Sequence, residues 1–65
     1  MRKARVQDIG CTWIRVVVSS GWPIYLDRDN ASGEAAAMLA GAKTSTGRAM
    51  YRAAVYAAKR WETGR

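Results

Sequence analysis

The 65-residue chain contains no histidine and only one cysteine, Cys11. An intrachain disulfide therefore cannot form, and the base that usually activates a cysteine nucleophile is absent. The lack of histidine also argues against a metal staple, because zinc sites are built mainly from cysteine and histidine. We therefore expect no catalytic residue, no metal site and no cofactor, so the protein is predicted not to be an enzyme.

Acidic residues are also scarce, with five Asp and Glu against eleven Lys and Arg, and the net charge is +6. The positive charge is concentrated in residues 1–8 and 43–65. Such a field attracts polyanions, including nucleic acid or the acidic face of a protein complex, although a charge offset also serves solubility.

Long apolar runs are missing as well. The basic start of the chain is followed by the polar residues Gln7, Asp8, Thr12 and Arg15, which does not fit a signal peptide, and no stretch reaches transmembrane length. A single free thiol suits a reducing compartment. The sequence therefore favours a cytoplasmic protein with no membrane partner.

A β-hairpin is predicted from residues 12–19 and 22–27. The first segment is dense in β-branched and aromatic residues, and Ser20 and Gly21 form a turn signal. Strict alternation divides the side chains between the two faces. The core-facing set is Ile14, Val16, Val18, Trp22, Ile24 and Leu26, and the opposite face displays Trp13, Arg15 and Tyr25.

Residues 46–61 have the periodicity of an amphipathic helix, with Ser45 as the expected N-cap. Its apolar face consists of Met50, Ala53, Ala54, Ala57 and Trp61, and its basic face carries Arg48, Arg52 and Lys59, with Val55 among them. We expect Met50 and Trp61 to be buried against the hairpin.

The alanine-rich segment at about residues 33–41 is predicted to be a short helix, with Ser32 as its N-cap and Gly41 at its end. A third strand over residues 34–40 is the alternative. The predicted fold class is α+β: one small domain over residues 11–65, in which a hairpin, or three strands, packs on the C-terminal helix. Residues 1–10 are predicted to be a flexible basic arm.

The stretch from Leu39 to Gly41, together with Thr44 to Thr46, Ala49 to Tyr51, and Ala53 and Ala54, resembles the strand-to-helix passage of plant ethylene-response DNA-binding domains. The resemblance implies a strand at residues 34–40 and an Arg15 that faces DNA. The predicted first strand lacks the dense Arg and Trp pattern of those domains.

The sequence favours a non-enzymatic module that binds DNA or RNA by neutralising phosphates, with help from stacking on aromatic residues. Free N–H groups at the start of the last helix, next to Lys43, are a further attraction for anions. The alternative is a phage- or plasmid-type accessory protein that docks on a host protein complex and inhibits it, for example an anti-CRISPR-like inhibitor. The sequence leaves a homodimer open. The candidate binding residues are Arg2, Lys3, Arg5, Trp13, Arg15, Tyr25, Lys43, Arg48, Arg52 and Lys59.

Overall fold

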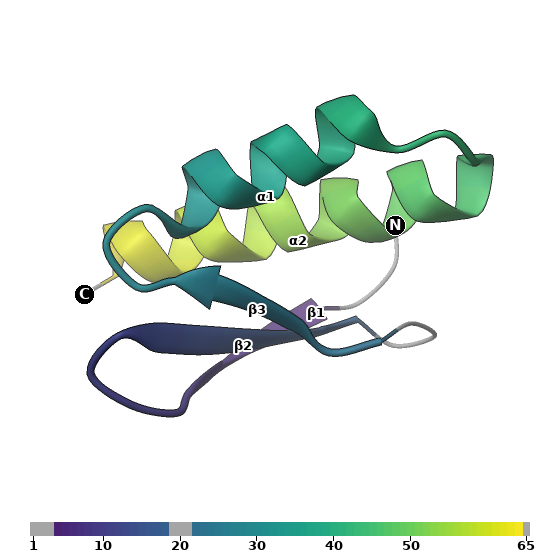
Figure 1. Ribbon diagram of the computed structural model, residues 1–65. Helices are drawn as coiled ribbons and strands as arrows, with labels where there is room; N and C mark the ends of the chain where they lie inside the picture. Colours follow the sequence, from purple (N-terminus) through teal and green to yellow (C-terminus); the bar gives the residue numbers. More distant parts are fainter. Residues whose placement is uncertain (1–3, 19–21, 65) are drawn as a thin grey trace.

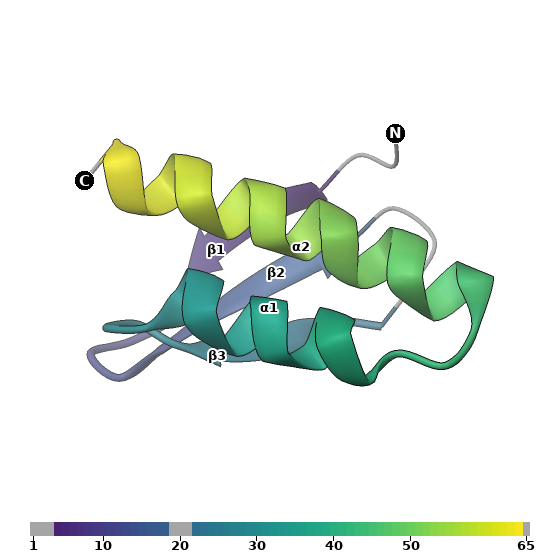
Figure 2. The same cartoon turned by 90° about the horizontal axis from the view of Figure 1, so that it is seen from above.

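The computed structural model describes residues 4–18 and 22–64, which form two layers (Figure 1). One layer is an antiparallel sheet in the order β1-β2-β3, and the other is a pair of helices that lie side by side over one face of it (Figure 2). This α+β architecture confirms the predicted class, with the hairpin packed on a C-terminal helix. The elements are β1 (Ala4–Asp8), β2 (Trp13–Val18), β3 (Ile24–Asp27), α1 (Ala31–Gly41) and α2 (Ser45–Thr63).

Strand β1 corrects the prediction for the start of the chain. Residues 4–8 pair with β2, so that Ala4 lies opposite Val18 and Val6 opposite Val16. The predicted flexible arm is therefore wrong for residues 4–8, and the third strand of the sheet comes from this segment. Arg2 and Lys3 of the predicted arm lie outside the described residues, as does the predicted turn at Ser20 and Gly21.

Helix α1 settles the two alternatives for the alanine-rich segment. Residues 31–41 are helical, which confirms the predicted short helix. The alternative of a strand at 34–40, which the resemblance to plant DNA-binding domains also implied, is wrong. Alanine is the strongest helix former, and a run of alanines has no branched side chains to favour a strand. The N-cap position is occupied by Asn30 rather than by the predicted Ser32.

Helix α2 begins one residue earlier than predicted. Thr44 is its N-cap, and the Thr44 hydroxyl accepts a hydrogen bond from the backbone N–H of Gly47 at 2.9 Å. This bond satisfies one of the free N–H groups of the first turn. The predicted cap, Ser45, is instead the first residue of the helix.

The core lies between the two layers and combines large side chains from the sheet with small ones from the helices. The inner face of the sheet supplies Ile14, Val16, Val18, Ile24 and Leu26, and the helices supply Ala31, Ala35, Ala53, Ala54, Ala57 and Ala58. Alanine side chains allow α2 to pack closely over β1 and β2, and α1 over β3. The fully buried helical side chains at this contact are therefore all alanines, and the larger ones of α2 pack at its margin.

Four apolar side chains depart from the predicted burial. Trp22 was expected in the core but is 79% exposed, because β3 begins only at Ile24 and the alternation does not extend back to it. Met50 and Trp61, which were expected to be buried against the hairpin, pack against the core but are only half-buried. Val55, which was placed on the basic face, also packs against the core.

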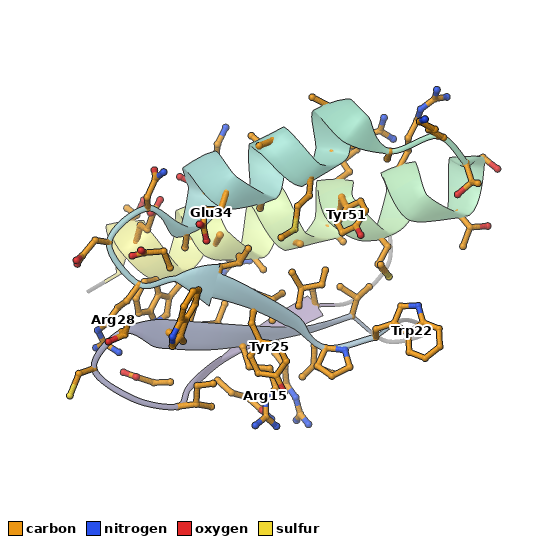
Figure 3. All side chains as sticks on the ribbon, in the orientation of Figure 1. Arg15, Trp22, Tyr25, Arg28, Glu34 and Tyr51 are labelled. Carbon is orange, nitrogen blue, oxygen red and sulfur yellow. The ribbon has the colours of Figure 1, made fainter. Side chains whose placement is uncertain are left out.

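Arg28 joins three parts of the chain at one end of the molecule (Figure 3). Its guanidinium donates hydrogen bonds to the Asp8 carboxylate and to the Gly10 carbonyl, the latter at 3.0 Å, and lies 5.4 Å from the ring centroid of Trp61. The hydrogen bond that Arg28 donates to Asp8 raises the pKa of Arg28 above its ordinary value. We call these four residues the Arg28 clasp.

Two carboxylates at the same end bind backbone N–H groups. Glu34 of α1 accepts a hydrogen bond from the N–H of Asp27, at the end of β3. Glu62 of α2 accepts one from the N–H of Ser32, in the first turn of α1, at 3.4 Å. A negative charge at this position also suits the positive end of the α1 dipole.

We expect Arg28→Ala to lower the melting temperature measurably, because it removes the hydrogen bonds to Asp8 and Gly10 and the cation–π contact with Trp61 together. Arg28→Lys keeps the charge but loses the forked geometry, and it should recover only part of the loss. Thermal unfolding followed by circular dichroism measures both. The matched control is Arg52→Ala on the exposed face of α2. Equal melting temperatures for Arg28→Ala and Arg52→Ala would contradict the clasp.

Candidate functional site

Both helices lie on the same side of the sheet, and within the described residues the other side carries no covering layer (Figure 1). Residues that alternate with the core positions point to this side, which we call the open sheet face. Pairing between the strands places Gln7 beside Arg15 and Arg15 beside Tyr25, so that one row crosses the sheet. The open sheet face consists of Arg5, Gln7, Trp13, Arg15, Val17, Tyr25 and Asp27.

Two aromatic rings dominate the open sheet face. Trp13 is 48% exposed and Tyr25 is 49% exposed. Trp13 lies opposite Asp27 in the ladder, so Trp13 and Tyr25 are diagonal neighbours on adjacent strands, at a typical separation of about 7–8 Å. Two large rings are thus presented to solvent close together on a rigid antiparallel ladder.

Arg15 lies in the centre of this face, on the middle strand. Its guanidinium carbon is 5.5 Å from the centroid of the Tyr25 ring, and Figure 3 shows both side chains pointing away from the helices. The Nε atom of Arg15 is shielded from solvent and has no hydrogen-bond partner among the described residues. A shielded donor without an acceptor costs free energy. The cation–π contact with Tyr25 therefore holds Arg15 in a position where its Nε–H group has no hydrogen-bond acceptor among the described residues.

The charges on the open sheet face favour an anionic ligand. Arg5 and Arg15 are its basic residues, and Asp27 is the acidic one among the residues described. The Asp27 carboxylate already accepts a hydrogen bond from the N–H of Asp29 at 2.8 Å. The negative charge of Asp27 is therefore partly neutralised by the loop that follows β3.

The predicted basic residues of the last helix belong to a different surface. Lys43, Arg48, Arg52 and Lys59 are all exposed, as predicted, but they lie in the helical layer, on the other side of the sheet from the open face. Arg60, which the sequence prediction omitted, adds to this basic helix surface and lies 5.8 Å from the centroid of the Tyr56 ring. The structure therefore brings Trp13, Arg15, Tyr25 and Arg5 together and separates them from the helical cations.

A cleft of about 530 Å³ lies where α1 joins α2, and the sequence prediction missed it. The apolar side chains in its lining come from three segments: Trp22 before β3, Met38 of α1, and Met50 and Tyr51 of α2. Lys43 and Thr46 also line it. We call this space the helix-junction cleft. In the sequence, the only sign of this cleft is Trp22 beside Pro23. The other residues of the lining are brought to Trp22 by the fold.

The described part of the chain shows no group of three or more His, Cys, Asp or Glu residues arranged to hold a metal ion. Cys11 is exposed. Neither helix, over the residues described, has the length and apolar character needed to span a bilayer. Comparison of the chain with family models, with curated proteins and with solved structures gives no match.

Proposed function

We propose that this protein is a non-enzymatic module that binds single-stranded nucleic acid on its open sheet face. The observation that carries the proposal is the pair of exposed rings, Trp13 and Tyr25, together with Arg15, which lies on the same strand as Trp13 and directly opposite Tyr25. An uncovered apolar cluster on an otherwise well-packed small domain is typical of an interaction surface.

Stacking of bases on Trp13 and Tyr25 favours single-stranded nucleic acid over a duplex. A base inside a duplex has both of its faces covered by neighbouring bases, whereas an unpaired base offers a face to a protein ring. Each base stacked on an aromatic side chain contributes about 1–3 kcal/mol, with little dependence on sequence. Trp13 and Tyr25 can thus accept two bases of a flexible strand, which favours binding without a strict sequence code.

Charge supplies the second part of the interaction. Arg5 and Arg15 on the open sheet face can neutralise phosphates between the stacked bases. A phosphate oxygen that reaches Arg15 would also give its unpartnered Nε an acceptor, once the guanidinium shifts from the Tyr25 ring. The basic helix surface, on the other side, raises the long-range attraction that a net charge of +6 exerts on any polyanion.

The same exposed Trp, Tyr and Arg side chains are the types that dominate protein–protein binding energy. The second candidate function is therefore docking of the open sheet face on an acidic surface of a host protein complex, as an inhibitory accessory protein of a phage or plasmid would do. Binding to nucleic acid at low salt distinguishes the two, because docking on a protein does not require it.

Titration of labelled single-stranded DNA, single-stranded RNA and duplex DNA by fluorescence anisotropy, at about 50 and 200 mM salt, tests the proposal. We expect both single strands to bind more tightly than the duplex. Tyr25→Ala should weaken binding of the single strands about 5- to 150-fold, which corresponds to the loss of one stacked base.

The matched control is Tyr56→Ala. Tyr56 is equally exposed, at 51%, and also lies near an arginine, but it belongs to α2. Its removal should leave the affinity within about twofold, as expected for a residue off the interface. Failure of both single strands to bind at low salt would reject the proposal and leave docking on a protein.

A further inference from the structure

The helix-junction cleft has a composition that the core and the basic surfaces do not share. Its lining combines two aromatic side chains, Trp22 and Tyr51, with two thioethers, Met38 and Met50, and its volume of about 530 Å³ lies within the range of small-molecule sites. Trp22 stands 79% exposed at its edge. An aromatic ring bound in the cleft would therefore contact side chains that now face solvent.

The polar part of the lining has a single sign of charge. Lys43 carries the positive charge, Thr44 and Thr46 contribute hydroxyl groups, and no acidic side chain is among the described residues that line the cleft. The first turn of α2, which begins beside Lys43, also contains no acidic residue. The cleft therefore suits a ligand that joins a flat aromatic ring to an anionic group.

We propose that the helix-junction cleft binds one nucleotide, with its base against Trp22 and Tyr51 and its phosphate at Lys43. This inference rests on the proposed function, since the nucleotide would belong to the strand bound on the open sheet face. A free nucleotide shares the same chemistry, so the cleft can be probed separately from the sheet.

The path between the two surfaces is short. Trp22 precedes Tyr25 by three residues, which span at most about 10 Å of extended chain. Trp22 lines the cleft together with residues of the helices, whereas Tyr25 belongs to the open sheet face. A strand that passes Pro23, which is exposed, can therefore reach the cleft after it leaves Tyr25.

The NMR signals of the methionine methyl groups report directly on binding of a ligand in the cleft. Met38 and Met50 both line the cleft. With ¹³C-methyl methionine, adenosine 5′-monophosphate should shift the Met38 and Met50 signals in a saturable manner. Adenosine without phosphate should bind about tenfold more weakly, because it cannot form the charge-assisted contact with Lys43.

Two substitutions test the assigned roles. Lys43→Gln should reduce the affinity for the monophosphate to that for adenosine, and Trp22→Ala should weaken both ligands. Both residues are exposed, so neither change should alter the far-ultraviolet circular dichroism. Failure of the monophosphate at about 10 mM to move either methyl signal, or equal binding by the wild type and Trp22→Ala, would overturn the inference.

The outcome for the cleft can be separated from that for the sheet. If single strands bind in a manner that requires Tyr25 while the methyl signals stay unmoved by the monophosphate, the cleft proposal is wrong and the proposed function stands. If the monophosphate binds at Trp22 but no single strand binds the protein, the cleft site stands alone and the strand-binding function is rejected. If neither ligand binds, both are rejected.

Discussion

Leu26→Ala is expected to destabilise the fold by about 2–5 kcal/mol, the range observed for removal of a buried leucine side chain. Leu26 is fully buried on the inner face of β3, beneath the helical layer. A domain of this length has a total stability on the order of 3–10 kcal/mol, so the variant should be largely unfolded or melt far below the wild type. Chemical denaturation followed by circular dichroism measures the loss.

Val17→Ala is the matched control for Leu26→Ala. Val17 lies on β2 but on the open sheet face, where it is only half-buried. Its truncation should cost no more than about 1 kcal/mol, the span of strand propensities. Because a slip of one residue in a strand exchanges its two faces, similar losses for the two variants would mean that the observed register is wrong.

The double variant Trp13→Ala/Tyr25→Ala should weaken the binding of single-stranded nucleic acid by about a hundredfold or more, because it removes two stacking partners. The two side chains are diagonal neighbours, so their separate losses need not add. The change leaves every charge in place, and the dependence of affinity on salt should therefore be preserved. Anisotropy titrations at two salt concentrations measure both quantities.

The comparison for the double variant is Arg52→Gln/Lys59→Gln, which removes two charges from the basic helix surface and no ring. This variant should bind about as strongly as the wild type at high salt and only moderately less at low salt. If it loses most of the affinity while Trp13→Ala/Tyr25→Ala keeps it, the nucleic acid binds to the helical layer and the open sheet face is the wrong surface.

The alternation of apolar and polar residues in strands and the helical periodicity correctly predicted those parts of the fold where the local sequence pattern matches the observed burial. Ile14, Val16 and Val18 point to the core as expected, since each is flanked by residues that tolerate solvent. Strand β1 was missed because Arg5 and Gln7 give it the composition of a loop. It is a strand because β2 offers it a partner, and pairing with another segment cannot be read from five residues alone.

In the candidate site too, the features that depend on neighbouring residues in one strand were predicted, and those that depend on distant segments were not. Trp13, Arg15 and Tyr25 were predicted on one face, because the parity of each residue along its strand decides the face. Their separation from Lys43, Arg48, Arg52 and Lys59 depends on which side of the sheet the helices cover, and parity does not reveal it. The helix-junction cleft was beyond prediction for a similar reason, since its walls come from three separate segments.

The main cover of β1 and β2 is synthesised last, because it comes from the second half of α2. The sheet is complete once residue 27 has been synthesised, but the alanines that cover β1 and β2 lie at positions 53 to 58. Until those residues emerge, the apolar inner face of the sheet remains without most of its cover. Stable burial of that face must therefore wait for the last turns of α2.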